Sequence, residues 1–427
     1  MRRIITERFC AYAAGGELTS TVRMTIRMRD AVELDMMREA LAVTQVRYPY
    51  FSVRLKMVNG TDGYEYFALE DNKLPWMMQT TCKPACLMGP ESNHHLLAFA
   101  CWDDCFAIDF FHGLTDGTGA YHLLRTLTYE YCRRRYDNSL SREGIRVAGD
   151  VIGPEEWTDP GVQSRPKELN PVQVPPQPRP ISLRTEAAAP HSGKFEAVFI
   201  SVDERQVMEH VAELGTTPAT LFSLLLARAV ARLHPSSSDA APAVSLAVNQ
   251  RPALGAPYAC QTLMSGITLT LNGELQRMAV GRQLAEFRNM IVSQLNVDNV
   301  IAEFYAMKER MDQLDLMPTI AARRKSMSAF ADMADLMGSC GLSYVGKANF
   351  GAAEQYVCEM YTEVDSPFEL LVEMAAIGGG FCITVMQRFE TDVYLDAFVD
   401  EMRHVGLMPA LSWRRPMQVA PITEFYK

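Results

Sequence analysis

The sequence has no excess of positive charge. Of its 427 residues, 41 are lysine or arginine and 51 are aspartate or glutamate, so the formal net charge at neutral pH is −10. Proteins that bind nucleic acid neutralise phosphates with lysine and arginine. The composition therefore argues against a nucleic-acid partner.

Long hydrophobic runs are also missing. A membrane-spanning helix needs about 18 or more consecutive apolar residues, and one of the longest apolar stretches, residues 221–233, is interrupted by arginines. Near the start of the sequence, Thr6, Glu7 and Arg8 interrupt any apolar core before it reaches the length found in signal peptides. We therefore expect no membrane span and a cytoplasmic protein.

The ten cysteines lack the dense, regular spacing of a disulfide scaffold, so we expect free, mostly buried thiols. Cys82 and Cys86, followed by His94 and His95, resemble a loose set of zinc ligands. The two histidines directly precede a predicted strand, however, and adjacent residues of a strand point to opposite faces. We expect no metal site there.

The length and the composition predict two mixed α/β lobes joined by a linker. A chain of 427 residues exceeds the size at which single hydrophobic cores stop growing. Residues 153–194 are rich in proline and poor in apolar periodicity, which is typical of an extended linker. We therefore assign residues 1–152 to an N-terminal lobe and residues 195–427 to a C-terminal lobe. A surface excursion within one domain is the alternative interpretation of the proline-rich segment.

Apolar periodicity places helices and strands in both halves. Leu34, Met37 and Leu41 share one face of a predicted helix, and Thr217 followed by Pro218 is typical of the start of another. The predicted helices cover residues 31–45, 120–135, 204–215, 217–230 and 393–405, and the predicted strands cover residues 51–57, 64–70, 95–102, 105–111, 243–248, 262–271, 341–345, 368–377 and 381–389.

One histidine lies where an apolar strand ends, in the stretch CFAIDFFHGLTDGTG (105–119). Loops at such strand ends build sites on mixed sheets. His112 has the one side chain whose ordinary pKa is near neutral, so it can accept and return a proton. Asp116 either orients that imidazole or pairs with a distant arginine. In a purely structural interpretation, Asp116 or Thr118 caps the next helix and His112 is an ordinary turn residue.

The run from His112 through Gly-Leu-Thr to Asp116 and Gly117 resembles the His-x-x-x-Asp-Gly signature of the chloramphenicol acetyltransferase-like acyltransferases. This superfamily also includes condensation domains and bacterial alcohol acetyltransferases. The resemblance implies two lobes with an active-site tunnel between them, His112 as the catalytic base and Gly117 as structural support. Phe111 stands where the commoner doubled motif has its first histidine, which is not the catalytic one.

Two later segments extend the resemblance. Residues 248–255 look like the segment in which the family places an arginine that pairs with the signature aspartate, so Arg251 is the implied partner of Asp116. Residues 342–351 are similar to the Ser-Asn-x-Gly segment of the alcohol acetyltransferase branch, with Tyr344 in place of asparagine. The likeness implies Ser343 as a catalytic hydrogen-bond donor and Tyr344 and Gly346 as substrate-binding residues. Without the resemblance, Arg251 and Ser343 are ordinary surface and strand residues.

The reaction implied by the resemblance is direct acyl transfer from acyl-CoA to the hydroxyl or amine of a small, hydrophobic acceptor, with acyl-CoA as a co-substrate and no permanently bound cofactor. A condensation-type enzyme that uses an acyl carrier protein, or a noncatalytic binding module of the same fold, are the alternatives. The basic residues 321–326 either meet a coenzyme A phosphate or form a solvated helix face. The 25 methionines either line an adaptable pocket or fill the core. We expect a monomer.

Overall fold

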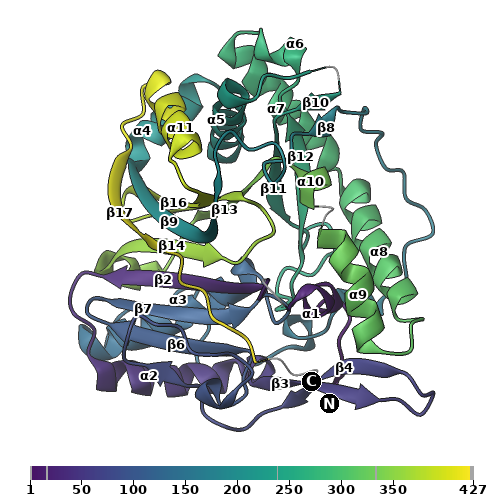
Figure 1. Cartoon of the computed structure of the whole chain (residues 1–427). Helices are drawn as coiled ribbons and strands as arrows, with labels where there is room; N and C mark the ends of the chain where they lie inside the picture. The colour runs from purple at the N-terminus through teal and green to yellow at the C-terminus, as the bar shows by residue number, and fades with distance from the viewer. Residues whose placement is uncertain (1, 16–17, 238, 332–333, 424–427) are drawn as a thin grey trace.

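Two β-sheets, one above the other in Figure 1, form the framework of the molecule, and helices cover them. The structure is a computed structural model, and it describes residues 2–15, 18–237, 239–331 and 334–423. A five-stranded sheet has the strand order β14-β2-β7-β6-β5, and a seven-stranded sheet has the order β12-β11-β13-β15-β16-β9-β17. The mixed α/β class that the sequence predicts is confirmed.

The helices and strands have the following bounds. The helices are α1 (Arg8–Ala13), α2 (Leu34–Arg47), α3 (Gly117–Arg135), α4 (Glu204–Glu213), α5 (Pro218–Leu233), α6 (Gly273–Gln276), α7 (Val280–Gln294), α8 (Val297–Leu314), α9 (Ile320–Ala331), α10 (Ala334–Met337) and α11 (Val393–His404). The strands are β1 (Arg2–Arg3), β2 (Thr21–Met28), β3 (Val53–Asn59), β4 (Glu65–Asp71), β5 (Met78–Gln79), β6 (Leu97–Trp102), β7 (Cys105–Phe111), β8 (Arg179–Pro180), β9 (His191–Asp203), β10 (Ala240–Ala241), β11 (Ala243–Asn249), β12 (Met264–Thr270), β13 (Cys340–Lys347), β14 (Val357–Val364), β15 (Leu370–Ile377), β16 (Gly380–Phe389) and β17 (Ala410–Pro416).

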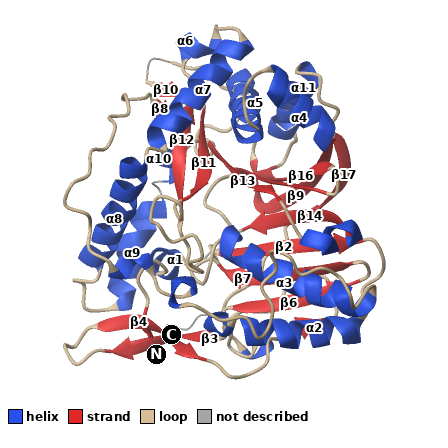
Figure 2. Ribbon diagram, turned by 180° about the vertical axis from the view of Figure 1, so that it is seen from behind, coloured by secondary structure: helices blue, strands red, loops and turns tan. Residues whose placement is uncertain are grey.

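The first sheet is buried on both faces at its centre. Every residue of β7 is buried, and β2 has a single exposed residue, Arg27. Helices α2 and α3 lie side by side against this sheet, as Figure 2 shows from behind, and Met37 and Leu127 of these helices belong to the same hydrophobic core as Phe99 and Phe106 of the strands. Because both faces of β7 are covered, its sequence is nearly continuously apolar.

The second sheet has helices α4, α5 and α11 on its outer face, away from the first sheet (Figure 2). Thr217 caps α5 and Pro218 occupies its first turn, as the sequence predicts. Most of α5 is buried, because α11 and the sheet cover it together. Among the described residues no single helix is long and apolar enough to cross a membrane; α4 and α5 satisfy the length and composition only as a pair, and they are bent by 90°.

Strand β14 comes from the second half of the chain but belongs to the first sheet. It pairs antiparallel with β2 from Met28 to Val22, and Figure 1 shows it between the two sheets. The side chain of Met360 on this strand is fully buried in the core of the first sheet, where Ala375 and Cys382 of the second sheet also pack. Periodicity did not reveal β14, and the predicted lobe boundaries describe the order of the chain rather than the membership of the sheets.

Helices α8 and α9 also belong to the second half of the chain and reach the first half, beside α1 in Figure 1. Asp315 at the end of α8 accepts hydrogen bonds from Arg8 at 2.8 Å and from the Tyr12 hydroxyl at 2.6 Å. Arg323 is completely buried and donates to the main-chain oxygens of Met317 and Asp315. The basic run 321–326 is therefore not simply a solvated helix face, and Arg323 is not available to a coenzyme A phosphate.

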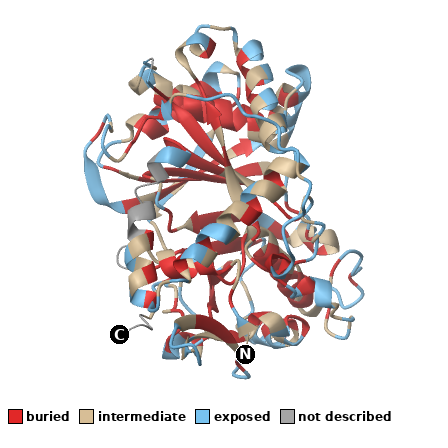
Figure 3. Ribbon diagram, turned by 90° about the vertical axis from the view of Figure 1, so that its right-hand side faces the viewer, coloured by how far each residue is buried: buried red, intermediate tan, exposed pale blue. Residues whose placement is uncertain are grey.

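The proline-rich segment is extended over much of its length, and its first part is anchored. Glu156 forms two-pronged contacts with Arg47 at 2.9 and 3.0 Å, and both side chains are buried. Asp159 accepts hydrogen bonds from the main chain and the hydroxyl of Thr6. Residues 154–162 thus pack as two short 3-10 turns, whereas most of residues 163–179 are exposed. Figure 3 shows how the buried residues gather in and between the two sheets.

The position of Met360 allows a test of how firmly the two sheets are joined. Truncating a fully buried methionine to alanine costs about 2–5 kcal/mol, through lost burial and the cavity left behind. We expect Met360→Ala to lower the free energy of unfolding by that amount in urea denaturation. Met57→Ala, at a position that is 46% exposed, is the matched control and should change it by less than about 0.5 kcal/mol.

Candidate functional site

His112 follows the last residue of β7 and lies at the junction of the two halves of the chain. Its main-chain N–H donates to the Ser20 oxygen at 2.8 Å, and the Thr262 hydroxyl donates to the His112 carbonyl oxygen. The backbone of His112 is therefore held from both halves. Its ring is partly buried and lies edge-on to Phe110, with the ring centres 6.5 Å apart.

The electrostatic environment of His112 favours the neutral imidazole. Burial lowers the pKa of His112 below its ordinary value, and the opposing influences are its own main-chain carbonyl and the charge of Asp116. Nδ1 is enclosed and has no hydrogen-bond partner of ordinary geometry among the described residues. Nε2 is then the ring nitrogen that can meet a substrate.

Asp116 and Arg251 form a buried, two-pronged ion pair between the two halves of the chain. Nη1 and Nη2 of Arg251 lie 2.7 and 2.9 Å from the two carboxylate oxygens, and the two residues are 1% and 3% exposed. The pairing expected from the resemblance is confirmed. Asp116 also caps α3 by accepting a hydrogen bond from Gly119 N–H at 3.1 Å. Of the three roles considered for this carboxylate, pairing with an arginine and capping the helix are present, and Asp116 has no hydrogen bond with the imidazole among the described residues.

A loop after Arg251 wraps the ion pair. The carbonyl oxygens of Ala259 and Gln261 accept hydrogen bonds from Arg251 at 2.9 and 2.6 Å, and Leu263 N–H donates to Asp116 at 2.9 Å. A buried charge is stable only when it is paired and its remaining hydrogen-bonding groups are satisfied. Residues 259–263 supply those partners. This loop could not be predicted from the sequence, because main-chain carbonyls leave no residue-type signal.

The glycines of the motif allow close packing at the start of α3. A Cβ atom on Gly119 would lie 2.0 Å from the Thr115 hydroxyl oxygen and 2.9 Å from the Cys260 carbonyl oxygen, so a larger residue does not fit there. A Cβ on Gly117 would lie 3.7 Å from Val345, an ordinary contact. Gly117 thus places the start of α3 against β13, and Gly119 is the position with the stricter requirement.

Two predicted site residues of β13, Ser343 and Tyr344, point to opposite faces of the sheet, because adjacent side chains of a strand alternate. The ring of Tyr344 stacks on Phe381 at 5.8 Å and packs against the outer core, and its burial raises its pKa to about 12. Ser343 shares its face with Val345, the residue that approaches Gly117. The structure therefore brings the Ser343 face, and not the Tyr344 ring, toward the start of α3.

Gly346 lies at an irregularity of β13, between the pairs made by Tyr344 and Lys347. Its φ of +86° is in the left-handed region that glycine adopts without strain. A Cβ atom there would meet no other atom within 4 Å. This backbone conformation explains why residue 346 is a glycine. A substrate-binding role for Gly346 stays a prediction.

Glu373 is a polar residue that the sequence analysis missed. It lies on β15 directly opposite Ser343 on one side and Thr384 on the other, and only 9% of it is exposed. Burial raises its pKa to about 7, against a hydrogen bond with Ser343 that lowers it. A single acidic residue inside the apolar run FELLVEMAAI was the signal that could have revealed it.

The thiols and the histidines outside the motif do not form a second reactive cluster. Cys260 lies beside the ion pair, but burial raises its pKa to about 12, so it stays protonated. His94 and His95 have ring nitrogens near main-chain oxygens, of Met88 at 3.3 Å and Leu74 at 2.9 Å. Within the described ranges, no three His, Cys, Asp or Glu side chains gather as metal ligands would.

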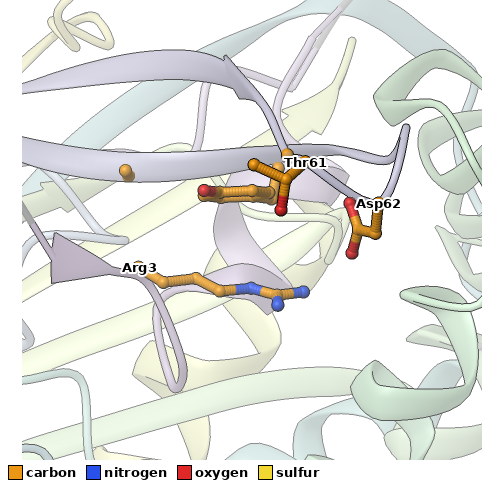
Figure 4. A pocket seen from close by; sticks show the side chains of 6 residues that line it. Arg3, Thr61 and Asp62 are labelled. Carbon is orange, nitrogen blue, oxygen red and sulfur yellow. The ribbon is translucent and has the colours of Figure 1, made fainter.

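A pocket of about 270 Å³ opens elsewhere, on the small sheet formed by β1, β4 and β3 (Figure 4). Arg3, Thr61 and Asp62 line it, and none of the motif residues does. The Arg3 guanidinium is already bound to Asp315 at 2.9 Å and lies 5.0 Å from the Tyr66 ring centre. This pocket is therefore a separate surface feature and not the space beside His112.

Comparison with known proteins identifies the fold. No family model and no curated protein sequence matches the chain. Among solved structures, TRI101 of F. sporotrichioides, complexed with coenzyme A and T-2, has a TM-score of 0.62 at 13% identity, over 96% of this chain and 99% of that one. The condensation domain of the Monacolin K polyketide synthase MokA has a TM-score of 0.59 at 12% identity, over 94% and 96%.

Polyketide synthase associated protein 5 of Mycobacterium tuberculosis is similar to the same degree, with a TM-score of 0.58 at 12% identity over 94% of this chain and 96% of that one. These likenesses extend over nearly the full length of each chain. The chain has the two-lobed chloramphenicol acetyltransferase-like fold that condensation domains share. The fold expected from the sequence is confirmed.

The ion pair generates a prediction about stability. Removing one partner of a buried ion pair leaves the other charge unpaired, at a cost of about 3–5 kcal/mol. We expect Asp116→Asn to lower the free energy of unfolding by that amount, measured by urea denaturation. Asp35→Asn is the matched control, because Asp35 is 94% exposed in its pair with Arg38, and such pairs contribute at most about 1 kcal/mol. Equal effects of the two substitutions would contradict the role given to the Asp116 pair.

Glu373 generates a prediction about pH. Its folded-state pKa of about 7 lies above its ordinary value of 4.5, so the stability it contributes is fully present below pH 4.5 and is lost as the pH rises through 7. Glu373→Gln removes this loss, and the difference amounts to at most about 3 kcal/mol. We expect the variant to lose less stability than the wild type between pH 5 and pH 8.5, by urea denaturation. Glu39→Gln, at an exposed position, is the control, and its stability should change with pH as that of the wild type does. If the stability of Glu373→Gln also changes with pH as that of the wild type does, the prediction is wrong.

Proposed function

We propose that the protein is an acyltransferase that moves an acyl group from acyl-CoA to a hydroxyl or amine of a small acceptor, with His112 as the general base. The observation that supports this most is the lowered pKa of the His112 imidazole at the junction of the two halves, with Nδ1 enclosed and the main chain held from both halves. A general base must be unprotonated at the working pH and within reach of the proton that it removes. The lowered pKa of His112 meets the first requirement.

In the proposed reaction, Nε2 of His112 removes the proton from the acceptor as its oxygen or nitrogen attacks the thioester carbonyl. The carbon–sulfur bond then breaks, and the imidazolium returns the proton to the leaving thiolate. Such proton transfer contributes about 10² to 10⁴ in rate. Asp116 does not take part directly, because its carboxylate is occupied by Arg251, Gly119 and Leu263; it is a positioning residue.

The oxygen of the thioester carbonyl gains negative charge during the attack and needs a hydrogen-bond donor. Ser343 is the candidate, because it lies on the face of β13 that includes Val345, next to the start of α3. The loss of one such donor costs about 3 kcal/mol of transition-state stabilisation. A serine hydroxyl has a single proton, so Ser343 can donate to the thioester oxygen only while Glu373 is protonated and is itself the donor in its hydrogen bond with Ser343.

Two other mechanisms have less support. A covalent acyl-cysteine would require a thiolate, and burial keeps Cys260, the cysteine beside the ion pair, protonated by raising its pKa to about 12. A noncatalytic binding module would not require an enclosed Nδ1 and a free Nε2 on the same imidazole. An acyl carrier protein as donor is the remaining alternative, suggested by the likeness in fold to the condensation domain of MokA.

The test is thiol release from acetyl-, butyryl- and octanoyl-CoA in the presence of mixed primary alcohols and amines. We expect His112→Ala to lower kcat/KM by about 10² to 10⁴ while the free energy of unfolding stays close to that of the wild type. His95→Ala is unsuitable as a control because His95 is completely buried, so His404→Ala, on the exposed end of α11, is used. An unchanged kcat/KM in His112→Ala would contradict the general-base role.

The same assay also tests how kcat/KM depends on pH. The pKa of His112 is lowered, so the neutral base persists as the pH falls to the ordinary histidine value of about 6.5. We expect kcat/KM of the wild type to stay on its plateau down to that pH and to fall only below it. A fall that begins at pH 7 or above would show that another group, such as Glu373, limits the reaction.

A further inference from the structure

Helix α3 begins at the proposed site and carries a polar face away from it. Thr118, His122 and Arg125 follow one another at intervals of four and three residues, so they lie on one side of the helix. The Tyr48 hydroxyl donates to the His122 carbonyl oxygen at 2.9 Å, and the Thr126 hydroxyl donates to the Arg146 carbonyl oxygen at 2.6 Å. This side of α3 therefore faces the loop that contains Arg146 and lies next to the anchored start of the linker.

Positive charge exceeds negative charge in this region. Glu156 is shared by Arg47 at 2.9 Å and Arg146 at 3.2 Å, so one carboxylate serves two guanidinium groups. Arg125 makes no ion pair within the described part of the chain; its guanidinium carbon lies 5.9 Å from the Tyr121 ring centre. Two of these three arginines thus share one carboxylate, and the third has no carboxylate partner among the described residues, in a chain whose net charge is −10.

The lowered pKa of His122 indicates that the electrostatic potential around it is positive. Its pKa is lowered to about 4, first by burial and then by the charges of Arg146, Arg125 and Arg251. The side chain is therefore neutral at physiological pH, with ring nitrogens that have no hydrogen-bond partner among the described residues. An anion placed beside it would be attracted by the same charges that keep it neutral.

One exposed aromatic side chain adjoins Arg146, and a second directly follows Glu156 in the chain. Tyr258 is 51% exposed and Trp157 is 48% exposed, and the guanidinium carbon of Arg146 lies 4.9 Å from the centre of the Tyr258 ring. Hydrogen bonds from Cys260 N–H to the Glu156 oxygen at 2.8 Å and from Gln261 Nε2 to the Trp157 oxygen at 2.7 Å hold the two segments together. Exposed aromatic rings beside arginine side chains are typical of sites that bind a base and its phosphates.

We propose that these residues, His122, Arg125, Arg146, Trp157 and Tyr258, form a nucleotide patch that binds the phosphate and adenine end of the acyl-CoA donor. The proposal rests on the proposed function and identifies where its donor is held. Arg125 and Arg146 hydrogen-bond phosphate oxygens as charge-assisted donors, and Tyr258 or Trp157 stacks on the adenine ring. Because part of the patch lies on the helix that follows His112, the proposal requires the thioester end of a donor held there to reach Nε2.

The direct test is calorimetric binding of four probes to the full chain: coenzyme A, 3′-dephospho-coenzyme A, 4′-phosphopantetheine and pantetheine. We expect the Kd to rise in that order, because the 3′-phosphate, then the adenosine with one phosphate, and then the last phosphate are removed. Arg125→Ala and Tyr258→Ala should each raise the Kd of coenzyme A at least tenfold and leave that of pantetheine unchanged. Arg146 is left intact, since its removal would weaken the neutralisation of buried Glu156.

The control variant is Arg135→Ala, on the same helix but ten residues further on, about 15 Å along its axis. It should bind coenzyme A as the wild type does. Equal affinities of coenzyme A and pantetheine for the wild type, or no change of the coenzyme A Kd in both patch variants, would overturn the proposal. Affinity for 4′-phosphopantetheine equal to that for coenzyme A would also overturn it, and would indicate a carrier protein as the donor.

Kinetics separate this inference from the proposed function. An acyl N-acetylcysteamine thioester has no phosphate and no adenine, so its turnover depends on His112 but not on the patch. We expect Arg125→Ala to raise the KM for acyl-CoA at least tenfold with kcat retained, and to leave turnover of the truncated thioester unchanged. An acyl-CoA KM equal to that of the wild type would contradict the patch. Failure of the wild type to use either thioester would instead contradict the proposed function.

Discussion

The ion pair between Asp116 and Arg251 is the interaction on which the arrangement of the candidate site depends. It joins a loop of the first half of the chain to a loop of the second, and it is buried from solvent. Because the loop at residues 259–263 satisfies the remaining hydrogen-bonding groups of both residues, this loop is fixed by the same pair. Thr262 of that loop donates a hydrogen bond to the His112 carbonyl oxygen, so the position of the histidine follows from a contact that does not involve its ring.

Buried ionisable groups near the junction of the sheets have different environments and therefore different protonation states. Asp116 has a guanidinium partner, whereas Glu373 has a serine hydroxyl and an elevated pKa. His112 is kept neutral by burial and His122 by burial together with the surrounding arginines. One small region thus combines a paired carboxylate, a carboxyl group that favours its proton and two neutral imidazoles. The arrangement is set by local partners and not by the acidic composition of the whole chain.

The sequence was informative where chemistry is concentrated in a few adjacent residues. The strand ending at Phe111 and the motif with its aspartate were accessible because residue types and spacing determine them, whereas Arg251 was accessible only through the family resemblance. The position of Tyr344 was not, since the family likeness identifies a segment, while the alternation of a strand determines which side chain faces the site. Glu373 and the loop at 259–263 were missed for another reason: their roles depend on pairing between strands and on main-chain oxygens. Arg323 was misread because a basic run does not indicate which of its members is buried.

Strand β14 has a consequence for how the protein is made. It completes the first sheet by pairing with β2, yet it is encoded more than 300 residues later in the chain. Until residues 357–364 leave the ribosome, β2 has an unpaired edge, and an unpaired edge can pair with another chain. The first half of the protein therefore cannot finish folding during its own synthesis. A version of the chain that ends before β14 would leave this edge of β2 unpaired permanently.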